Sequence, residues 1–303
     1  MNILFTGGGG IYAEYIYRKL NKNVFFADAD IKNMHPIIEE SKKFKVEKAN
    51  SEFYIKSIQN ILKKLNIDLL VPTVDEELLP IIRQKSNINS EILLPDEKHI
   101  ILFLDKKKSS DYFSNNNFGP KTEDIDEANL NEKKYIIKPR FGRGSRGIQI
   151  INNKEQYFSY LNLYELNNNE IILQEYIEGE EYTVTMVADK NGNLINIYPI
   201  VALLKKGSTV NAYGSLNKEV IAFCKSFHDK TKIKNIYNIQ MIFNRSSGSH
   251  IFEINPRVST TLSASLFYNN FKFDELLRNK DKLTSDWAQL KLIRKFTSYI
   301  LLL

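Results

Sequence analysis

The chain has 303 residues, of which 43% are hydrophobic and 26% are charged, and its formal net charge is +6. These values are ordinary for a globular protein, and the length allows one large core or two to three smaller ones. The single cysteine, Cys224, excludes a disulfide framework within the chain, and no apolar run approaches the ~20 residues of a membrane span. The lysines are scattered without a basic stripe interleaved with aromatic residues, so we expect no nucleic-acid and no membrane partner.

The first hundred residues alternate short apolar runs with amphipathic stretches. The runs are typical of strands buried in a parallel sheet and cover residues 3–5, 24–27, 69–71 and 92–94. Helices are predicted over residues 11–20 and 52–65. The pattern predicts a doubly wound parallel-sheet domain. Because the chain enters directly with a strand rather than a signal peptide, we expect a cytoplasmic protein.

A glycine-rich loop, residues 7–10, follows the first predicted strand, and Asp28 ends the second. The glycines allow a tight turn and let a helix N-terminus approach an anion. The arrangement is similar to a dinucleotide-binding fingerprint, but a lone glycine loop of this kind occurs in many domains that bind no nicotinamide. We therefore infer no dinucleotide cofactor from it.

The pattern changes near residue 105. A helix is predicted to open at Leu104-Asp105-Lys106 and to run to about Asn116, where a glycine and a proline end it. Strands then dominate, with helices near residues 154–166 and 216–230. The predicted strands cover residues 135–138, 148–151, 171–174, 182–188, 194–201, 237–243 and 251–254. Such blocks predict α+β lobes after the first domain.

Residues 136–148 contain a strand that ends in Lys138, a glycine-rich loop and a second strand. Backbone N–H groups of such a loop can cradle phosphates, and Lys138 adds a point charge. The spacing does not match the P-loop pattern, and no helix follows the loop. A mobile surface hairpin is the alternative. Three loop arginines disfavour it, because like charges repel unless an anion neutralises them; they are Arg140, Arg143 and Arg146.

Residues 173–182 lead from an apolar strand into an acidic linker. The backbone of such a linker offers hydrogen bonds to an adenine edge, and an acidic residue beyond it suits ribose hydroxyls. Adenine sites are mostly apolar walls with a few placed polar groups, which fits this composition. Taken alone, the segment is equally consistent with an exposed acidic loop.

The segment Glu253-Ile254-Asn255-Pro256-Arg257 carries the most informative polar pattern. Glu253 and Asn255 are two residues apart, so on a strand both side chains leave the same face. Gln240 is expected opposite them on the preceding antiparallel strand, with residues 246–249 as the turn. Mg²⁺ prefers oxygen ligands and shares its shell with nucleotide phosphates, so the pattern indicates a magnesium site. An ordinary polar hairpin is the alternative, which the upstream motifs disfavour.

These motifs occur in one order along the chain, and in that order the chain resembles the ATP-grasp superfamily. It is most similar to the branch related to the large subunit of carbamoyl phosphate synthase and to small amino-acid ligases such as the pyrrolysine-biosynthesis ligase. The residues that carry the resemblance are Asp105-Lys106, Gly119-Pro120, Lys138 with its loop, residues 174–181 and residues 253–257. The resemblance implies a pre-ATP-grasp domain over residues 1–104 and an ATP-grasp domain over residues 105–303. The latter would comprise a nucleotide lobe of about 105–175 and a metal and substrate lobe of about 176–303.

The resemblance also implies a nucleotide-binding role for each matching residue. Phosphates would be bound by Lys106, Lys138, Arg143, Ser145 and Arg146, although the loop is shorter than in the synthase and its detailed contacts stay open. Adenine would be bound by Gln174, Glu175 and Ile177 and flanked by Tyr176, and ribose by Glu181.

A metal set and catalytic roles follow from the same resemblance. Gln240, Glu253 and Asn255 would hold Mg²⁺, or Mn²⁺ in its place, with Glu253 bridging two ions per site. Arg257 would stabilise the phosphoryl group in transit, and Lys138, Glu253 and Arg257 would be the catalytic residues.

The expected activity is that of an ATP-dependent carboxylate–amine ligase that activates an amino acid or small acid as an acyl phosphate. Residues 203–215, with Lys205, Lys206 and Tyr213, and residues 259–265 are candidate specificity segments. A kinase that stops after phosphorylation and a non-catalytic nucleotide-binding subunit are the alternatives. Partners are small-molecule carboxylate and amine substrates, and a homodimer stays open. The four histidines are dispersed and predict packing rather than catalysis; they are His35, His99, His228 and His250.

Overall fold

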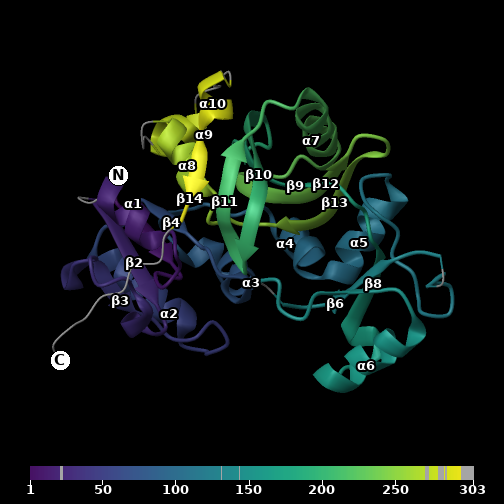
Figure 1. The fold of residues 1–303 in the computed structure, drawn as a ribbon. Coiled ribbons are helices and arrows are strands. Elements are labelled where there is room, and N and C mark those ends of the chain that lie inside the picture. Colours follow the sequence, from purple (N-terminus) through teal and green to yellow (C-terminus); the bar gives the residue numbers. More distant parts are fainter. Residues whose placement is uncertain are drawn as a thin grey trace.

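Three β-sheets organise the molecule (Figure 1). The structure, a computed structural model, describes residues 1–20, 23–130, 132–142, 144–269, 273–278, 283 and 285–294. A five-stranded parallel sheet comes first, and a three-stranded and then a six-stranded antiparallel sheet follow. This confirms the predicted combination of a doubly wound domain with α+β lobes.

The N-terminal sheet is covered on both faces, which is why its strands are apolar. Its elements are β1 (Ile3–Thr6), α1 (Ala13–Leu20), β2 (Val24–Asp28), β3 (Lys43–Lys45), α2 (Tyr54–Lys64), β4 (Leu69–Val71), α3 (Asp75–Arg83), β5 (Glu91–Ile92) and α4 (Glu97–Leu104). Phe5 packs on the side of α1, and Leu4 packs with α2, α3 and α4 on the other side. The strand order β3-β2-β1-β4-β5 makes the carboxyl ends of β1 and β4 a topological switch point, where α/β domains usually place functional groups.

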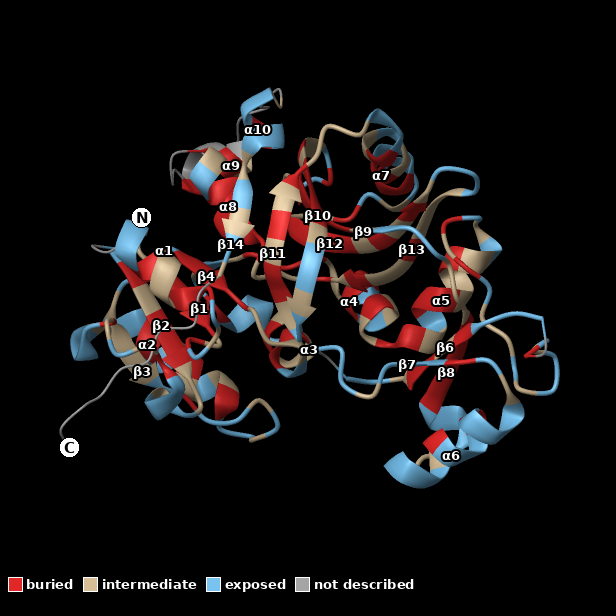
Figure 2. Ribbon diagram, in the orientation of Figure 1, coloured by how far each residue is buried: buried red, intermediate tan, exposed pale blue. Residues whose placement is uncertain are grey.

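A helix and a small lobe follow: α5 (Lys106–Asn115), β6 (Tyr135–Pro139), β7 (Gln149–Ile151), α6 (Lys154–Tyr164) and β8 (Ile171–Glu175). The sheet order is β7-β6-β8, and alternate residues such as Ile137 and Leu173 pack with Tyr157 and Tyr160 of α6. Most of the rest of α6 faces solvent (Figure 2). Lys138 and Gln174 lie on the opposite face of β6 and β8, and both side chains are buried.

The last lobe comprises β9 (Glu180–Ala188), β10 (Leu194–Lys206), β11 (Ser208–Gly214), α7 (Lys218–Thr231), β12 (Ile236–Asn244), β13 (Gly248–Asn255), α8 (Leu262–Tyr268), α9 (Phe273–Arg278), α10 (Ser285–Gln289) and β14 (Lys291–Ile293). Its sheet order is β13-β12-β9-β10-β11-β14. One face packs on aromatic residues of three helices, namely Phe103 of α4, Phe113 of α5 and Phe227 of α7. The other face packs in part against the N-terminal sheet and α8 and α9, whereas Gln240 of β12 and Glu253 and Asn255 of β13 line a cavity.

Several elements differ from the sequence-based prediction. Strand β10 continues past residue 201 to Lys206 and turns at Gly207 into β11, so a long hairpin replaces the expected single strand. Gly207 has a φ of +71°, a conformation that favours glycine. Helices α3 and α4 were not predicted, because Pro80 interrupts the first pattern and the second is apolar on most sides. Strand β5 ends at Ile92 rather than at residue 94.

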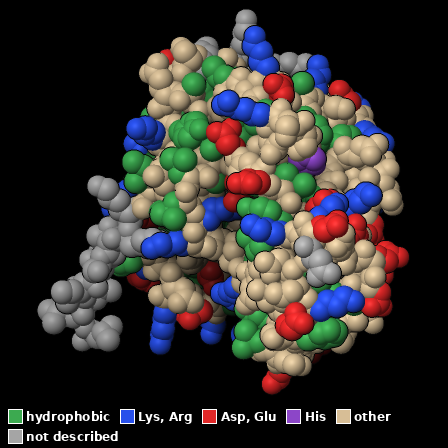
Figure 3. All heavy atoms as spheres, turned by 45° about the vertical axis from the view of Figure 1, so that its right-hand side comes forward, with side chains coloured by type: hydrophobic (Ala, Val, Ile, Leu, Met, Phe, Trp, Pro, Cys, Tyr) green, Lys and Arg blue, Asp and Glu red, His purple; other side chains and the backbone are tan. Residues whose placement is uncertain are grey.

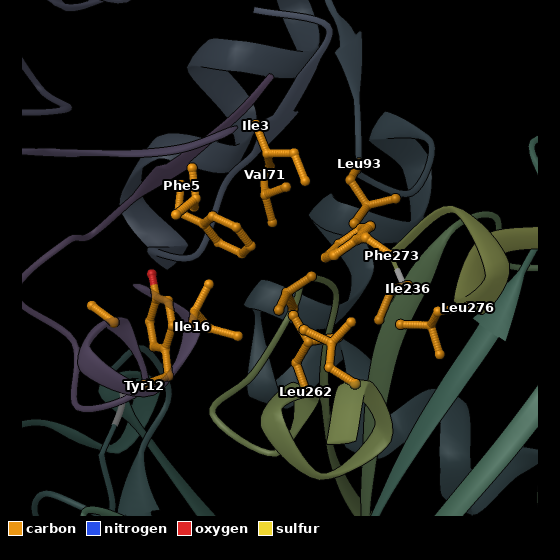
Figure 4. Packing of buried hydrophobic residues seen from close by; sticks show 14 of the residues in the cluster. Ile3, Phe5, Tyr12, Ile16, Val71, Leu93, Ile236, Leu262, Phe273 and Leu276 are labelled. Atoms are coloured by element: carbon orange, nitrogen blue, oxygen red, sulfur yellow. The ribbon is translucent and has the colours of Figure 1, made fainter. Parts of the chain in front are cut away.

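The N-terminal sheet and the last lobe share one hydrophobic core (Figure 4). Phe5 and Ile16 belong to the same buried cluster as Leu262, Phe273 and Leu276. The rings of Phe5 and Phe273 meet edge to face with centroids 6.2 Å apart. Because protein interiors are close-packed, this core holds the carboxyl edge of the parallel sheet in a fixed position relative to the segment after β13.

The described helices include none that is both long and apolar enough to cross a bilayer. On the face shown in Figure 3, basic and acidic side chains are interspersed. A continuous basic stripe, the usual footprint of a nucleic-acid site, is not seen on that face.

Replacing Phe227 by alanine tests the core behind the six-stranded sheet. Phe227 is fully buried and contacts the rings of Phe103, Phe113 and Phe118. The cavity left by Phe227→Ala should lower the free energy of unfolding by about 3–5 kcal/mol in urea titrations. Phe158→Ala, at a side chain 54% exposed on α6, is the control and should cost less than about 1 kcal/mol. Equal losses in the two variants would contradict this description of the core.

Candidate functional site

A β-bulge places the oxygen-bearing residues on one face of the β12–β13 hairpin. Gln240 pairs with Glu253, whereas the next residue, Met241, pairs with Ile251, so Phe252 is an extra residue in β13. Ile251 and Ile254 both pack into the core behind the sheet. The bulge thereby turns Phe252 and Glu253 to the open face, where simple alternation from Ile251 would have buried Glu253.

Gln240, Glu253 and Asn255 line one cavity of about 130 Å³ together with Lys205 and Arg257. The three predicted metal ligands are thus brought together. No group of three or more His, Cys, Asp or Glu side chains capable of holding a metal occurs among the described residues. A cation placed here has one carboxylate and two amide oxygens from the protein, so it must complete its shell elsewhere. That donor set suits Mg²⁺ shared with nucleotide phosphates.

Lys106 and Lys138 line an adjoining cavity that also contains Glu253 and the loop residues Gly142 and Ser145. The Lys138 Nζ atom donates to Gln174 Oε1 at 3.1 Å and to the Phe252 carbonyl at 3.3 Å. Burial lowers the pKa of Lys138 to about 8; the Glu253 carboxylate opposes that shift and the Lys106 ammonium adds to it. The site therefore holds a buried ammonium whose hydrogen-bond partners in the protein are neutral.

The predicted loop residues are only partly engaged in this cavity. Ser145 and Arg146 line it, and Ser145 has a φ of +58°. Arg143 lies outside the described residues. Arg140 instead makes a two-pronged ion pair with Asp105, with Nε–Oδ1 at 2.8 Å and Nη2–Oδ2 at 2.7 Å. Because Asp105 also caps helix α5, Arg140 anchors the loop beside Lys106 rather than reaching for a phosphate.

The linker predicted for adenine and ribose is bonded to neighbouring strands and loops through its side chains and its backbone. Gln174 is buried, its side chain holds Lys138 and the Ser110 hydroxyl, and its backbone pairs with Ile136 of β6. The Glu175 carboxylate pairs with Lys133 at 2.8 Å, and the Tyr176 N–H donates to the Lys134 carbonyl.

Beyond that linker, the Glu181 carboxylate accepts a hydrogen bond from Lys205, whose ammonium also lies 2.8 Å from Gln240 Oε1. Lys205 thus links the residue predicted for ribose to a predicted metal ligand. Lys205 lines the metal cavity, but the other specificity candidates of its hairpin, Lys206 and Tyr213, are not among the lining residues.

Arg257 follows β13 and lies between the two halves of the molecule. The Arg257 carbonyl accepts from Asn238 Nδ2 at 2.8 Å, and the guanidinium Nε donates to Asp75 Oδ1 at 2.5 Å. Burial alone would lower the pKa of Arg257, but the Asp75 carboxylate beside it raises that pKa above its usual value. The guanidinium is therefore charged and held at the edge of the metal cavity.

Two residues of the site escaped the sequence analysis. The Phe252 ring lies 5.8 Å from Lys138 Nζ and 6.0 Å from Lys205 Nζ, and this apolar surface separates the two ammonium groups. The sequence shows an aromatic residue at position 252, but simple alternation places that residue on the face opposite to Glu253. Asp75 lies 182 residues from Arg257 in the chain, and no local pattern reveals such a contact.

The glycine-rich loop of the N-terminal domain uses its own backbone donors. The N–H groups of Gly8, Gly9 and Gly10 donate to the Ala27 carbonyl, to Asp28 Oδ2 and to the Gly7 carbonyl, respectively. Asp28 thus caps the loop. These three donors are therefore engaged within the N-terminal domain.

Comparison with known proteins places this site in a family. The model described as "ATP-grasp domain" matches residues 104–261, just over half of the chain. The matched range includes both lysines, the linker, the bulged hairpin and Arg257. The chain therefore belongs to the ATP-grasp family, as the order of its motifs predicted.

Curated relatives and solved structures agree with that assignment. The chain is 37% identical over 75 residues to a D-alanine–D-alanine ligase of Petrotoga mobilis, covering 25% of this chain and 24% of that protein. It is 25% identical over 218 residues to the carbamoyl phosphate synthase large chain of Clostridium botulinum, covering 68% of this chain and 19% of the synthase. It thus spans less than a quarter of either relative.

The fold is similar to that of N5-carboxyaminoimidazole synthetase from Staphylococcus aureus in complex with ADP. The TM-score is 0.66 at 15% identity, and the match covers 93% of this chain and 78% of that one.

The lowered pKa of Lys138 makes nucleotide affinity depend on pH. Below pH 8 Lys138 carries the charge that a phosphate attracts, and above pH 8 the free site loses it. The dissociation constant for ADP, measured by calorimetry, should therefore rise about tenfold between pH 7 and pH 9. Lys138→Arg is the matched variant, because a guanidinium stays protonated throughout this range and should flatten the profile. A wild-type profile that is already flat would contradict the prediction.

Proposed function

We propose that the protein is an ATP-dependent carboxylate–amine ligase that activates a small carboxylic acid as an acyl phosphate. The observation that carries the proposal is the convergence, around Glu253, of two buried lysines, three oxygen ligands and Arg257. The two curated relatives described above are, by name, a ligase and a synthase. The division into residues 1–104 and 105–303 is part of the proposal and is supported by the change of sheet at α5.

In this proposal ATP lies between the two later sheets. Lys106 and Lys138 hold its phosphates, with Ser145 and Arg146 above them. The linker of residues 174–177 lies at the adenine edge, and Glu181 holds the ribose. Mg²⁺ at Gln240, Glu253 and Asn255 supplies charge neutralisation of the transferring phosphoryl group, with two ions as the expected number.

The chemistry divides into two balanced steps. A carboxylate oxygen of the substrate attacks the γ-phosphorus, the bond to the β-phosphate oxygen breaks, and ADP leaves with that electron pair. The amine then attacks the acyl carbon, releases inorganic phosphate and loses a proton. Lys138 and Arg257 position and neutralise the transferring group, so no nucleophilic side chain is required. Cys224 fits a packing role instead, because it is fully buried and burial raises the pKa of its thiol.

The lining of the metal cavity favours a polar acid. Hydroxyl side chains come from Thr183, from residues 208–209 of the β10–β11 hairpin and from residues 259–261, and the described lining contains no apolar side chain. The Ser259 and Thr261 hydroxyls already bond to each other, but an apolar substrate group would offer no partner to the other hydroxyls of this lining, at about 1–3 kcal/mol for each unsatisfied group. A small polar acid would satisfy them.

Isosteric pairs of amino acids test that preference. Asparagine should be activated with a kcat/KM at least about tenfold above that of leucine, and threonine should similarly exceed valine, because each member of a pair fills the same volume. ADP release in a coupled assay measures both. Faster turnover of leucine than of asparagine would exclude a polar substrate.

The metal and ligase assignments are tested by one assay. Purified protein with Mg²⁺-ATP should release equimolar ADP and phosphate only when a carboxylate and an amine are both present. Glu253→Gln should reduce that release by at least about 100-fold, because it removes the carboxylate from the metal set. Glu155→Gln, at an exposed position on α6, is the matched control and should behave as wild type.

Each contrary result has a definite meaning. ADP without free phosphate, together with a phosphorylated product, would replace ligase by kinase. Near-normal turnover by Glu253→Gln would remove Glu253 from the metal site. Tight nucleotide binding without turnover of any acid would favour a non-catalytic nucleotide-binding subunit.

A further inference from the structure

Asp75 connects the N-terminal domain to the proposed catalytic arginine. We infer that Asp75 is a positioning residue for phosphoryl transfer: it orients the Arg257 guanidinium toward the transferring group and keeps it away from Glu253. The inference deepens the proposed function and rests on the role given there to Arg257. It assigns the N-terminal domain a direct part in the geometry of the active site.

The backbone around Asp75 is held from within its own domain. Asp75 is the first residue of α3, directly after the turn that follows β4. Glu77, which is 4% exposed, accepts hydrogen bonds from the N–H groups of Thr73 and Val74, each at 2.9 Å, and from the Tyr54 hydroxyl at 2.6 Å. This network fixes the turn, so the Asp75 carboxylate leaves a rigid platform at the switch point of the sheet.

Arg257 is held independently on the other side. Asn238, which is fully buried, donates to the Arg257 carbonyl, and its own side-chain oxygen accepts from the Thr185 hydroxyl at 2.9 Å. The guanidinium donates through Nε to Asp75 and through Nη1 to the Val258 carbonyl at 3.2 Å. A guanidinium has five N–H donors, so these two bonds fix its plane and leave three donors for an anion.

The Arg257–Asp75 ion pair differs from a purely structural ion pair in its burial and in its position beside the cavity. The side chains of Arg257 and Asp75 are only 13% and 21% exposed, and Arg257 lines the same cavity as Gln240 and Glu253. The Arg83–Glu97 pair is nearly as short, at 2.6 Å, but its side chains are 56% and 44% exposed.

Without Asp75, the acidic group near Arg257 that belongs to the metal cavity is Glu253. If the Arg257 guanidinium paired with Glu253, it would block a proposed metal ligand. It would also no longer point toward the transferring phosphoryl group. Loss of Asp75 should therefore affect both the rate of transfer and the requirement for Mg²⁺.

A double-mutant cycle tests the inference. Asp75→Asn keeps the shape of the side chain and should lower kcat by about 10–100-fold, raise the half-saturating Mg²⁺ concentration, and leave the KM for ATP within about threefold. Arg257→Lys should lower kcat comparably, and the double variant should be no slower than the slower single variant, because both act through one interaction. Glu97→Gln is the control and should leave all three parameters unchanged. Additive losses, or a normal kcat for Asp75→Asn, would overturn the inference.

A second readout separates this inference from the proposed function. The Nε–H resonance of Arg257, assigned by its disappearance in Arg257→Lys, should move or exchange rapidly in Asp75→Asn and persist in Glu97→Gln. An unchanged resonance in Asp75→Asn would overturn the inference even if the enzyme is a ligase. If no acid is turned over, the proposed function fails, and this resonance still decides whether Asp75 orients Arg257. Asp75→Glu, which keeps the charge but displaces it, replaces Asp75→Asn if the latter does not fold.

Discussion

The burial of two ammonium groups is the constraint around which the site is organised. Lys106 and Lys138 are 9% and 3% exposed, and the hydrogen bonds of Lys138 go to neutral oxygens of Gln174 and Phe252. Removing a charge from water without an opposite charge in contact is expensive. Glu253 lines the same cavity but is also the one carboxylate of the metal set. An anionic phosphate chain that brings its own cation resolves both requirements, because the anion satisfies the lysines and the cation satisfies Glu253.

The bulge at Phe252 allows one hairpin to contribute side chains both to the hydrophobic core and to the candidate site. Strict alternation makes every second residue of β13 apolar and buried. The extra residue lets Ile251 and Ile254 both enter the core while Phe252 and Glu253 both lie on the other face. A bulge re-aims side chains without adding a loop, so the residues proposed to hold the metal stay on strands. The Phe252 ring, between Lys138 and Lys205, gives the same face an apolar surface.

The sequence was sufficient for features set by local periodicity. The apolar runs predicted the buried strands of the parallel sheet, and the spacing of Glu253 and Asn255 with Gln240 predicted the polar face of the hairpin. It was insufficient where tertiary packing overrides local pattern. Helix α4 forms although its apolar residues show no strong one-sided stripe, since it is enclosed by the sheet and by α5.

The sequence also did not allow us to predict which partners individual side chains would contact. Arg140 was expected to lie near a phosphate with the other loop arginines. Nothing in the loop sequence shows that it would instead make two hydrogen bonds to Asp105, the N-cap residue of α5. Gln174 was expected at the adenine edge, but its side chain bonds to Lys138 and its backbone pairs with Ile136. Such choices depend on which partner lies nearest in the folded chain, and spacing along the sequence does not encode them.

In this proposal the N-terminal domain contributes to the geometry of the active site. Three donors of its glycine-rich loop are used internally, whereas the turn after β4 presents Asp75 to Arg257. A contact between two domains can fix a side chain only if the domains do not move apart. The core shared by Phe5, Leu262 and Phe273 provides that condition, because separation would expose apolar surface worth about 25 cal/mol per Å². Hydrophobic packing at one end of the interface thus maintains a charged contact at the other, where an error of an ångström would misdirect the guanidinium.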